Sequence, residues 1–329
     1  MNKSEKNYYS PANNNNFLSI KYLKKFILIW NNIFKNDKNN AIKYNNNNKK
    51  EIYFYKLINN KIIEIHNDFD NKYWLWYGIL KKIAFMKNEY KNNLKKFESL
   101  KYYEEIDLKP EKPISWYNDP TEWLSNYDIL NVMEQYEKKK KYNYKFLGVF
   151  PIDFATKINN HCLYSDVCSI NLNNIKKNIK FVGLITNLDK HNEPGSHWTS
   201  LFMVIDPKLI TYGAYYYDST GSPIPENLNI FIESIAKQCN DKYMKKYNKE
   251  FKIIYNKKKH QYKGTECGVF SMVFQIRFLN KNIVKNNNTS FDEIIKGNPN
   301  INDNTMVKLR DELFRPNTKS ELEKYTIMI

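Results

Sequence analysis

Three side chains in this chain could together carry out nucleophilic chemistry: Cys267, His197 and Asp218. Cys267 follows the loop YKGTE and begins the apolar run CGVFSMVFQIRFL, which predicts a buried helix. A helix N-terminus carries about half a positive charge and free N–H groups, and both favour a thiolate. Gly264 and Gly268 flank the cysteine and leave room for a ligand beside the backbone. We therefore interpret Cys267 as a nucleophile, with a small core residue at a helix start as the alternative.

His197 and Asp218 are expected at the open end of one β-hairpin. Residues 198–205 and 211–217 are rich in β-branched and aromatic residues and predict two strands joined by a turn at Pro207. A hairpin centred directly after Pro207 pairs residues whose numbers add up to 415, as those of His197 and Asp218 do. Strand bulges could shift this register by one or two residues. The pattern predicts an imidazole beside a carboxylate, and a surface pair without a function is the alternative.

A thiol, an imidazole and a carboxylate are the groups of a nucleophilic triad. The imidazole removes the thiol proton, the carboxylate orients the imidazole, and the thiolate attacks an acyl carbon. The oxyanion that forms needs hydrogen-bond donors close by. The backbone N–H of Cys267 is one candidate for this oxyanion hole, and the side chain of Gln261, six residues earlier, is the second.

The elements that must position these groups follow the segment KPEKP at 109–113, where two prolines mark a boundary. Beyond it, helical patterns at about 121–137, 225–248 and 267–280 alternate with short apolar runs. This alternation predicts an α+β domain over residues 111–329. The apolar runs that predict its strands are FLGVFPIDF, KFVGLITNL, WTSLFMVID, YGAYYYDS and FKIIYN.

A mostly helical N-terminal region, residues 17–110, is expected before this domain. Residues 1–16 are polar and are predicted to be a disordered tail. Residues 17–35 carry apolar positions at helical spacing and predict a packed amphipathic helix, with binding to a membrane surface as the alternative. Residues 36–50 are an Asn/Lys-rich linker, and residues 51–105 contain few helix breakers and predict further helices.

The chain carries a formal net charge of +17 and a sequence pI of about 9.3. Such a charge raises the question of a nucleic-acid partner. Lys and Asn are spread over the whole sequence, as an AT-rich genome would impose, and no aromatic-interleaved basic segment stands out. We therefore expect at most weak, non-specific binding of nucleic acid.

The cysteines are expected to be reduced thiols in a cytosol-like compartment, because the N-terminus has no apolar signal-peptide region. His161 lies near two of them, but without a Cys-x-x-Cys pair we predict no metal site, and we expect no cofactor. The longest apolar run of the N-terminal region, 26–30, is too short to span a bilayer. The four cysteines are Cys162, Cys168, Cys239 and Cys267.

The motifs resemble the clan of ubiquitin-like-protein proteases and the adenovirus protease. That clan shares the order His-Trp, Asp or Asn, Gln and Cys-Gly, which stands here as His197-Trp198, Asp218, Gln261 and Cys267-Gly268. A narrower resemblance is to the core-polyprotein proteases of large cytoplasmic DNA viruses of the African swine fever type, which carry Asn where Asp218 stands. It rests on the HW pair and on YYDSTGSPIP, HQYKGTECG, MVKLRDELFR, WLSNYDILNVMEQYE and FLGVFPIDF.

The resemblance implies a papain-like cysteine protease core of the ubiquitin-like-protease type, in which a twisted mixed sheet packs on the helix that bears Cys267. It implies an endopeptidase that cleaves after Gly-Gly-type sequences in viral structural or core polyproteins during virion maturation, in the host cytoplasm or the virion. We place Trp198, Gly268 and Trp123 along a narrow substrate channel, with a core aromatic as the alternative for Trp198.

Other functions remain open. A protease that removes SUMO or ubiquitin-like proteins shares every catalytic residue with a polyprotein protease. An acetyltransferase of the bacterial-effector kind shares the Cys–His–acid geometry, although no inositol-phosphate cluster is present. A non-enzymatic, DNA-associated core protein would account for the charge and leave the triad unexplained. We expect a polypeptide substrate and a monomeric protein.

Overall fold

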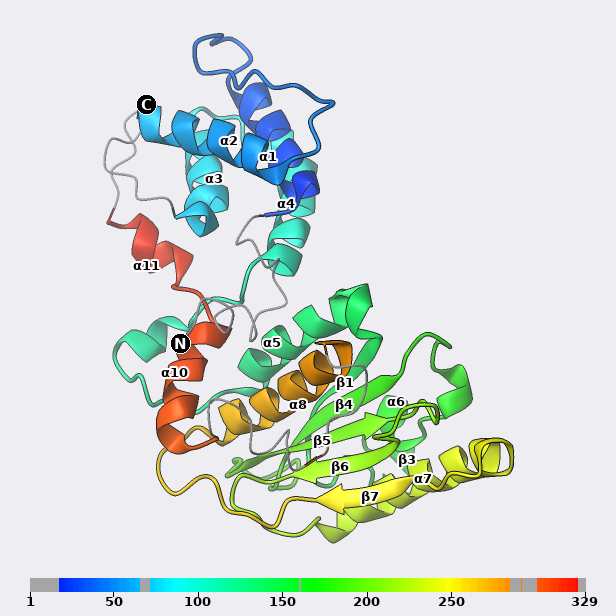
Figure 1. Ribbon diagram of the computed structural model, residues 1–329. Coiled ribbons are helices and arrows are strands. Elements are labelled where there is room, and N and C mark those ends of the chain that lie inside the picture. Colours follow the sequence, from blue (N-terminus) through cyan, green and yellow to red (C-terminus); the bar gives the residue numbers. More distant parts are fainter. Residues whose placement is uncertain (1–17, 66–71, 160, 285–290, 292–300, 325–329) are drawn as a thin grey trace. The chain divides into compact units, whose positions relative to one another are not determined.

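The computed structural model describes residues 18–65, 72–159, 161–284, 291 and 301–324 (Figure 1). The predicted disordered tail, residues 1–16, lies outside these residues. Within the described ranges, the chain divides into two compact units, one made of residues 1–118 and 313–329 and the other of residues 119–312.

This division differs from the boundary expected after residue 110. Backbone hydrogen bonds join Lys112 to the carbonyl of Arg315 and Arg315 to the carbonyl of Pro110, each at 2.8 Å. The Trp116 ring packs edge-on against Phe314, with ring centroids 4.9 Å apart. The segment after the two prolines is therefore bound to the C-terminal residues of the helical unit. Neither segment shows a sign of this pairing in its sequence.

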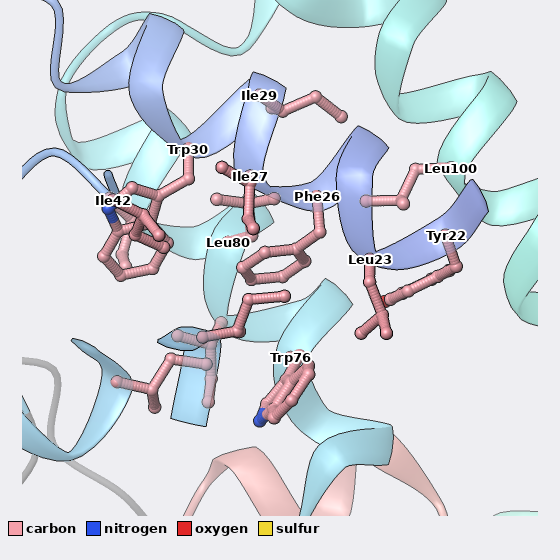
Figure 2. Close-up of a cluster of buried hydrophobic side chains, with 14 of the residues drawn as sticks. Tyr22, Leu23, Phe26, Ile27, Ile29, Trp30, Ile42, Trp76, Leu80 and Leu100 are labelled. Atoms are coloured by element: carbon pink, nitrogen blue, oxygen red, sulfur yellow. The ribbon is translucent and has the colours of Figure 1, made fainter. Parts of the chain in front are cut away.

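The helical unit forms around one apolar core, as expected for the N-terminal region. Ser19 caps its first helix, since its Oγ accepts a hydrogen bond from the backbone N–H of Tyr22. The apolar face of that helix, including Phe26 and Trp30, points into the core (Figure 2). The helix is therefore packed, as predicted. The helices of this unit include α1 (Ile20–Ile33), α2 (Glu51–Ile65), α3 (Trp76–Met86), α4 (Leu94–Asp107) and α11 (Thr318–Leu322).

The linker between α1 and α2 is held by polar contacts. Asn31 donates its Nδ2 to the carbonyl of Ile42 and accepts a hydrogen bond from the N–H of the same residue. Trp30 donates its indole N–H to the carbonyl of Asn40 at 2.7 Å. In the described part of the chain, no helix has the length and apolar character needed to cross a membrane.

The second unit contains, among its described residues, a five-stranded mixed sheet in the order β1-β4-β5-β6-β7 (Figure 1). The central pairs β4–β5 and β5–β6 are antiparallel, and the outer pairs β1–β4 and β6–β7 are parallel. Every predicted strand is present. The strands are β1 (Tyr144–Pro151), β4 (Phe181–Asn187), β5 (Trp198–Val204), β6 (Gly213–Tyr217) and β7 (Lys252–Tyr255), and β2 (Lys157–Ile158) pairs separately with β3 (His161–Cys162).

Helices cover both faces of the sheet, which explains why β5 and β6 are almost continuously buried. On one face, α8 packs through stacked aromatic rings, with Phe202 and Phe278 4.7 Å apart. On the other face, α7 packs through Phe231 and its neighbours. The helices of this unit include α5 (Asn126–Lys138), α6 (Ser165–Cys168), α7 (Glu226–Tyr247), α8 (Cys267–Val284) and α10 (Asp303–Leu313), whose last residue belongs to the helical unit.

Two of the four cysteines form a disulfide, Cys162–Cys168. The expectation of four reduced thiols is wrong for this pair. Cys162 ends β3 and Cys168 ends the one-turn helix α6, so the chain turns back and brings the two Cα atoms to 5.8 Å, a distance that a disulfide spans. Among the described residues, Cys239 and Cys267 are free and buried.

Candidate active site

Cys267 is the first residue of α8 and is only 4% exposed. The chain turns ahead of it at Gly264, whose φ of +74° lies in the left-handed region that favours glycine. The first turn of α8 is fixed to the sheet, because Ser271 donates its hydroxyl to the carbonyl of Trp198 at 3.0 Å. The sequence therefore places the thiol at a helix N-terminus and beside the start of β5.

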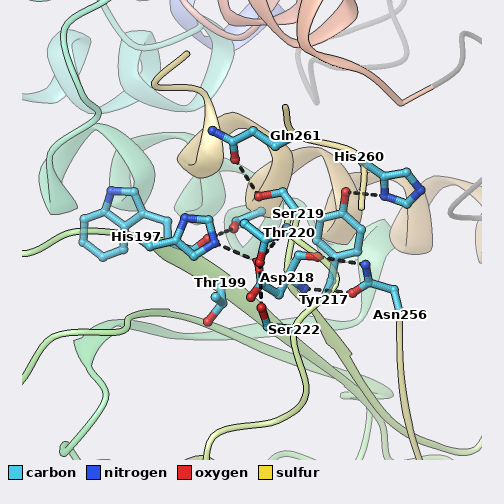
Figure 3. Close-up of polar contacts among 12 residues, drawn as sticks. His197, Thr199, Tyr217, Asp218, Ser219, Thr220, Ser222, Asn256, His260 and Gln261 are labelled. Carbon is cyan, nitrogen blue, oxygen red and sulfur yellow. Dashed lines mark hydrogen bonds and ion pairs between the residues drawn. The ribbon is translucent and has the colours of Figure 1, made fainter. Parts of the chain in front are cut away.

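His197 and Asp218 meet at the adjacent ends of β5 and β6. The imidazole Nε2 lies 2.7 Å from Asp218 Oδ1 (Figure 3). The register between the strands differs from the expected one, since Ser200 faces Tyr217 and paired numbers add up to 417. A shift of two keeps every side chain on its face of the sheet and makes the two residues diagonal neighbours, which long side chains still bridge.

The electrostatics of the pair follow from burial and hydrogen bonds. Burial lowers the pKa of His197, but hydrogen bonds with Asp218 and Cys267 outweigh it and raise the pKa to about 9. Burial raises the pKa of Asp218, but its bonds with His197 and the N–H of Thr220 hold it below its usual value. Because Nε2 faces Asp218, the other ring nitrogen, Nδ1, is the one left for the Cys267 thiol. The three groups therefore lie in one hydrogen-bonded series.

Gln261 is held by two polar contacts (Figure 3). Ser219 donates its hydroxyl to Gln261 Oε1 at 2.6 Å, and Gln261 Nε2 donates to the carbonyl of Gly264 at 3.1 Å. These contacts fix which end of the amide is the donor. An amide nitrogen carries two hydrogens, so one remains for a developing oxyanion. The role of this side chain in an oxyanion hole stays a prediction.

The three expected channel residues lie close to this site. Trp198 donates its indole N–H to the carbonyl of Leu124 at 3.0 Å. Gly268 packs so closely that a Cβ there would come within 2.8 Å of Leu124 Cδ1 and 3.2 Å of Trp198 Cδ1. Trp198 and the half-exposed Trp123 line a pocket of about 450 Å³, whose other lining residues include Phe150.

A buried ion pair lies directly beside Cys267 in the sequence. Arg310, from α10, donates to Glu266 Oε1 at 3.1 Å, and both side chains are almost fully buried. Burial raises the pKa of Glu266, and the charge of Arg310 opposes that rise. Arg310 also donates to the carbonyl of Glu122. It therefore attaches the loop before Cys267 to the segment that carries Trp123.

Sequence reasoning missed two residues that contact the site, Arg310 and Asn256. Arg310 lies in the segment MVKLRDELFR, which carried part of the resemblance, but nothing in its local pattern pointed to Glu266. The side chain of Asn256 accepts a hydrogen bond from the N–H of Asp218 and donates one to the carbonyl of the same residue. In a chain so rich in Asn, this one gave no signal. Among the described residues, no group of three or more His, Cys, Asp or Glu could hold a metal ion.

Comparisons with known proteins agree with this geometry. Residues 168–323 match the Ulp1 protease family, C-terminal catalytic domain. A protein named as a thiol protease in Acanthamoeba polyphaga mimivirus is 36% identical over 182 residues, which are 53% of this chain and 54% of the relative. A cysteine protease of African swine fever virus is 27% identical over 141 residues, which are 43% of this chain and 46% of the relative. The chain thus spans about half the length of the curated relatives it matches.

The fold is also shared with a solved structure. A crystal structure of the African swine fever virus protease superposes with a TM-score of 0.50 and 19% identity, covering 72% of this chain and 80% of that chain. The residues matched by the family model include β4, β5, β6 and β7 of the mixed sheet and the helix that begins at Cys267. The match of this chain is therefore to the catalytic domain of the Ulp1 protease family, over residues 168–323.

Proposed function

We propose that this protein is a cysteine-type endopeptidase that cleaves polypeptides after Gly-Gly-type sequences. We propose that its substrates are structural or core polyproteins of a virus, cut during virion maturation in the host cytoplasm or the virion. One observation carries the proposal: His197 lies 2.7 Å from Asp218, and its pKa is raised by interaction with both Asp218 and Cys267, the first residue of α8. The two viral relatives support it. The enzyme works as a monomer without a cofactor.

The reaction uses the three groups in sequence. His197 takes the thiol proton through Nδ1, and the thiolate of Cys267 attacks the carbonyl carbon of the scissile bond. The C–N bond breaks as the imidazolium gives its proton to the leaving amine, and a thioester remains on Cys267. His197 then removes a proton from water, whose oxygen attacks the thioester. A carboxylate leaves, and the thiol is restored.

The donors proposed for the oxyanion are the backbone N–H of Cys267 and the free hydrogen of Gln261 Nε2. Stabilisation of this charge is often the largest single contribution to catalysis, and loss of one donor costs about 10² to 10³ in kcat. The Ser219 contact supports this role of Gln261, because it holds the amide with its nitrogen directed away from Ser219.

The preference for glycine is proposed to come from Trp198. Its indole is fixed by Leu124 and lies against Gly268, so the ring cannot turn aside to admit a larger residue. A protease for ubiquitin-like proteins is the second candidate. Asp218 favours it, because the acid position here carries Asp, as in the cellular branch of the clan that the sequence resembles.

The test compares cleavage of a viral-type polyprotein segment and of a SUMO fusion, each with one Gly-Gly site. We expect the wild-type chain to cut after the second glycine, and Cys267→Ala to lose at least about 10³-fold in rate with an unchanged circular dichroism spectrum. Cys239→Ala, which removes the other buried free thiol, is the matched control and should keep its activity. Cleavage by Cys267→Ala at the wild-type rate would refute the proposal, and preference for the SUMO fusion would select the second candidate.

A further inference from the structure

The side chain of Asn256 is used almost entirely to hold the backbone of the proposed catalytic acid. It is 2% exposed. Its Oδ1 accepts a hydrogen bond from the N–H of Asp218 at 2.9 Å, and its Nδ2 donates to the carbonyl of the same residue at 2.8 Å (Figure 3). The second hydrogen of Nδ2 goes to the carbonyl of Lys258 at 2.9 Å. Both donors of the amide are therefore occupied, so neither is left for a substrate.

Asn256 acts at the point where the sheet ends. The parallel pairing of β6 and β7 ends with Tyr216 opposite Tyr255, and the N–H of Asn256 still donates to the carbonyl of Tyr216. One residue pair further along, the backbone ladder stops. There the amide side chain makes the two hydrogen bonds that a neighbouring strand would make to Asp218. The side chain of Asn256 thereby continues the hydrogen bonding of the sheet by one residue, Asp218.

The following residues hold the next part of the backbone in the same way. The N–H groups of His260 and Gln261 both donate to the carbonyl of Ser219, at 2.8 and 2.9 Å. The N–H of Gly221 donates to the carbonyl of Asp218 at 2.9 Å. Segment 256–261 thus fixes the backbone of Asp218 and Ser219 from one side, through the side chain of Asn256 and the backbone N–H groups of His260 and Gln261.

The carboxylate itself has few contacts that could hold it in place. Oδ1 binds His197 and the N–H of Thr220, and Oδ2 has no hydrogen-bond partner among the described residues. The direction in which Asp218 approaches His197 therefore depends on where its backbone is held. A displacement of about 1 Å at such a group can cost 10² in rate, because the imidazole must be oriented for proton transfer.

We infer that Asn256 is a positioning residue that acts on the reaction through Asp218. The inference rests on the proposed function, in which Asp218 orients His197. Among the described residues, the hydrogen bonds of the Asn256 side chain go to Asp218 and Lys258, and none goes to Cys267 or His197. Replacing Asn256 should therefore lower the reaction rate only when residue 218 is an aspartate.

A double-mutant cycle tests this dependence. In the wild-type background, Asn256→Ala should lower kcat on a Gly-Gly peptide by about 10- to 100-fold and leave KM within about twofold. In the Asp218→Ala background, the same change should lower kcat less than about twofold. Equal losses in the two backgrounds would overturn the inference, since they would mean that Asn256 supports the fold or another group. If Asn256→Ala does not fold, Asn256→Asp replaces it in the cycle, because it keeps the volume and the acceptor and loses both donors.

Asn240→Ala is the matched control. Asn240 Oδ1 accepts a hydrogen bond from the N–H of Phe251 at 2.9 Å, which is a contact of the same kind in the same unit. It should lower the free energy of unfolding and leave kcat unchanged. A loss of kcat equal to that of Asn256→Ala would mean that general loosening of the unit is the cause, and the inference would fail.

A readout without substrate separates this inference from the proposed function. The rate at which iodoacetamide alkylates Cys267, measured by peptide mass mapping, reports on the His197–Asp218 pair through the thiolate. Asn256→Ala should slow alkylation in the wild-type background and not in Asp218→Ala. If the chain cuts no polypeptide but alkylation follows this pattern, the proposed substrate is wrong and the inference stands. If Asp218→Ala slows alkylation and Asn256→Ala does not, the inference is wrong.

Discussion

His197 and Asp218 are two groups whose pKa values move apart when they come together in the folded chain. The pKa of His197 is raised to about 9, because its bonds to Asp218 and Cys267 outweigh burial, and the pKa of Asp218 is lowered. Because its pKa is raised on folding, His197 contributes its full stabilisation at a pH below about 6.5, the pKa of the unfolded chain. This contribution is lost as the pH rises through about 9, the pKa in the folded chain. Because its pKa is lowered on folding, Asp218 contributes its full stabilisation at a pH above about 3.9, the pKa of the unfolded chain. This contribution is lost as the pH falls further.

These shifts predict the pH dependence of Asp218→Asn. The difference in free energy of unfolding between wild type and Asp218→Asn should be largest between about pH 4 and 6.5, and it should shrink as the pH rises to about 9. Urea unfolding across this range, followed by tryptophan fluorescence, measures it. Asp166→Asn, at an exposed carboxylate of the same unit, is the control and should show little change with pH. A difference that grows toward pH 9 would contradict the assigned ion pair.

For single residues, the amino-acid sequence identifies the groups proposed to react better than the groups that hold them in place. Cys267 was found because glycines and an apolar helix surround it, and His197 because a hairpin brings it to a carboxylate. Asn256 and Arg310 hold their partners from 38 and 44 residues away in the sequence. Contacts between residues so far apart in the sequence are set by the packing of strands and helices, which local sequence patterns do not encode.

At the scale of elements, the helix that begins at Cys267 depends on α10 through the buried pair of Glu266 and Arg310. Loss of one partner from a buried pair leaves an uncompensated charge and typically costs about 3–5 kcal/mol. Arg310→Met should therefore lower the free energy of unfolding by about that amount, measured by urea titration. Glu266→Gln combined with Arg310→Met should recover most of the loss.

A surface pair provides the comparison for this prediction. Lys138 lies 3.0 Å from Glu134 on α5, with both side chains over a third exposed. Lys138→Met should change the free energy of unfolding by less than about 0.5 kcal/mol, because solvent screens such pairs. An Arg310→Met variant as mild as Lys138→Met would show that Glu266 does not need its partner.

The hairpin illustrates how far an element can be predicted. Both strands were placed correctly, but the turn was assumed to be centred after Pro207. The structure has a longer connection, in which Leu209 donates its N–H to the carbonyl of Asp206 and Tyr212 donates to Leu209. This loop shifts the pairing by two residues. The contact of His197 with Asp218 was still predicted correctly, because a shift of two preserves the face of each side chain.

At the scale of the whole molecule, the charge of +17 calls for its own test. If it reflects composition, binding of duplex DNA should be weak and blind to sequence. It should largely vanish by about 200 mM salt, because counterion release makes affinity fall steeply with salt. Peptide cleavage should be the same with and without DNA. Stimulation by DNA that persists near physiological salt would instead mean that the basic surface is a functional groove.

The division into units was the least predictable feature at this scale. Composition changes near the two prolines, and that marks one side of the boundary. The return of residues 313–324 to the helical unit rests on contacts such as the Arg315–Glu111 ion pair at 2.8 Å, which joins segments about 200 residues apart. No property of either segment alone identifies its partner. The same holds for the Cys162–Cys168 disulfide, whose formation depends on the turn between β3 and α6.

The place of Arg310 in the chain also has a consequence for a protein that is still being synthesised. Arg310 is added more than 40 residues after Cys267 and more than 100 after His197. At roughly 5–20 residues per second, the interval between His197 and Arg310 is on the order of ten seconds. Once Glu266 has been added, it lacks its counter-ion until Arg310 follows, and until then the loop ahead of the thiol is not attached to the carbonyl of Glu122. A growing chain that does not yet contain Arg310 should therefore show less of the proposed activity than a chain that does.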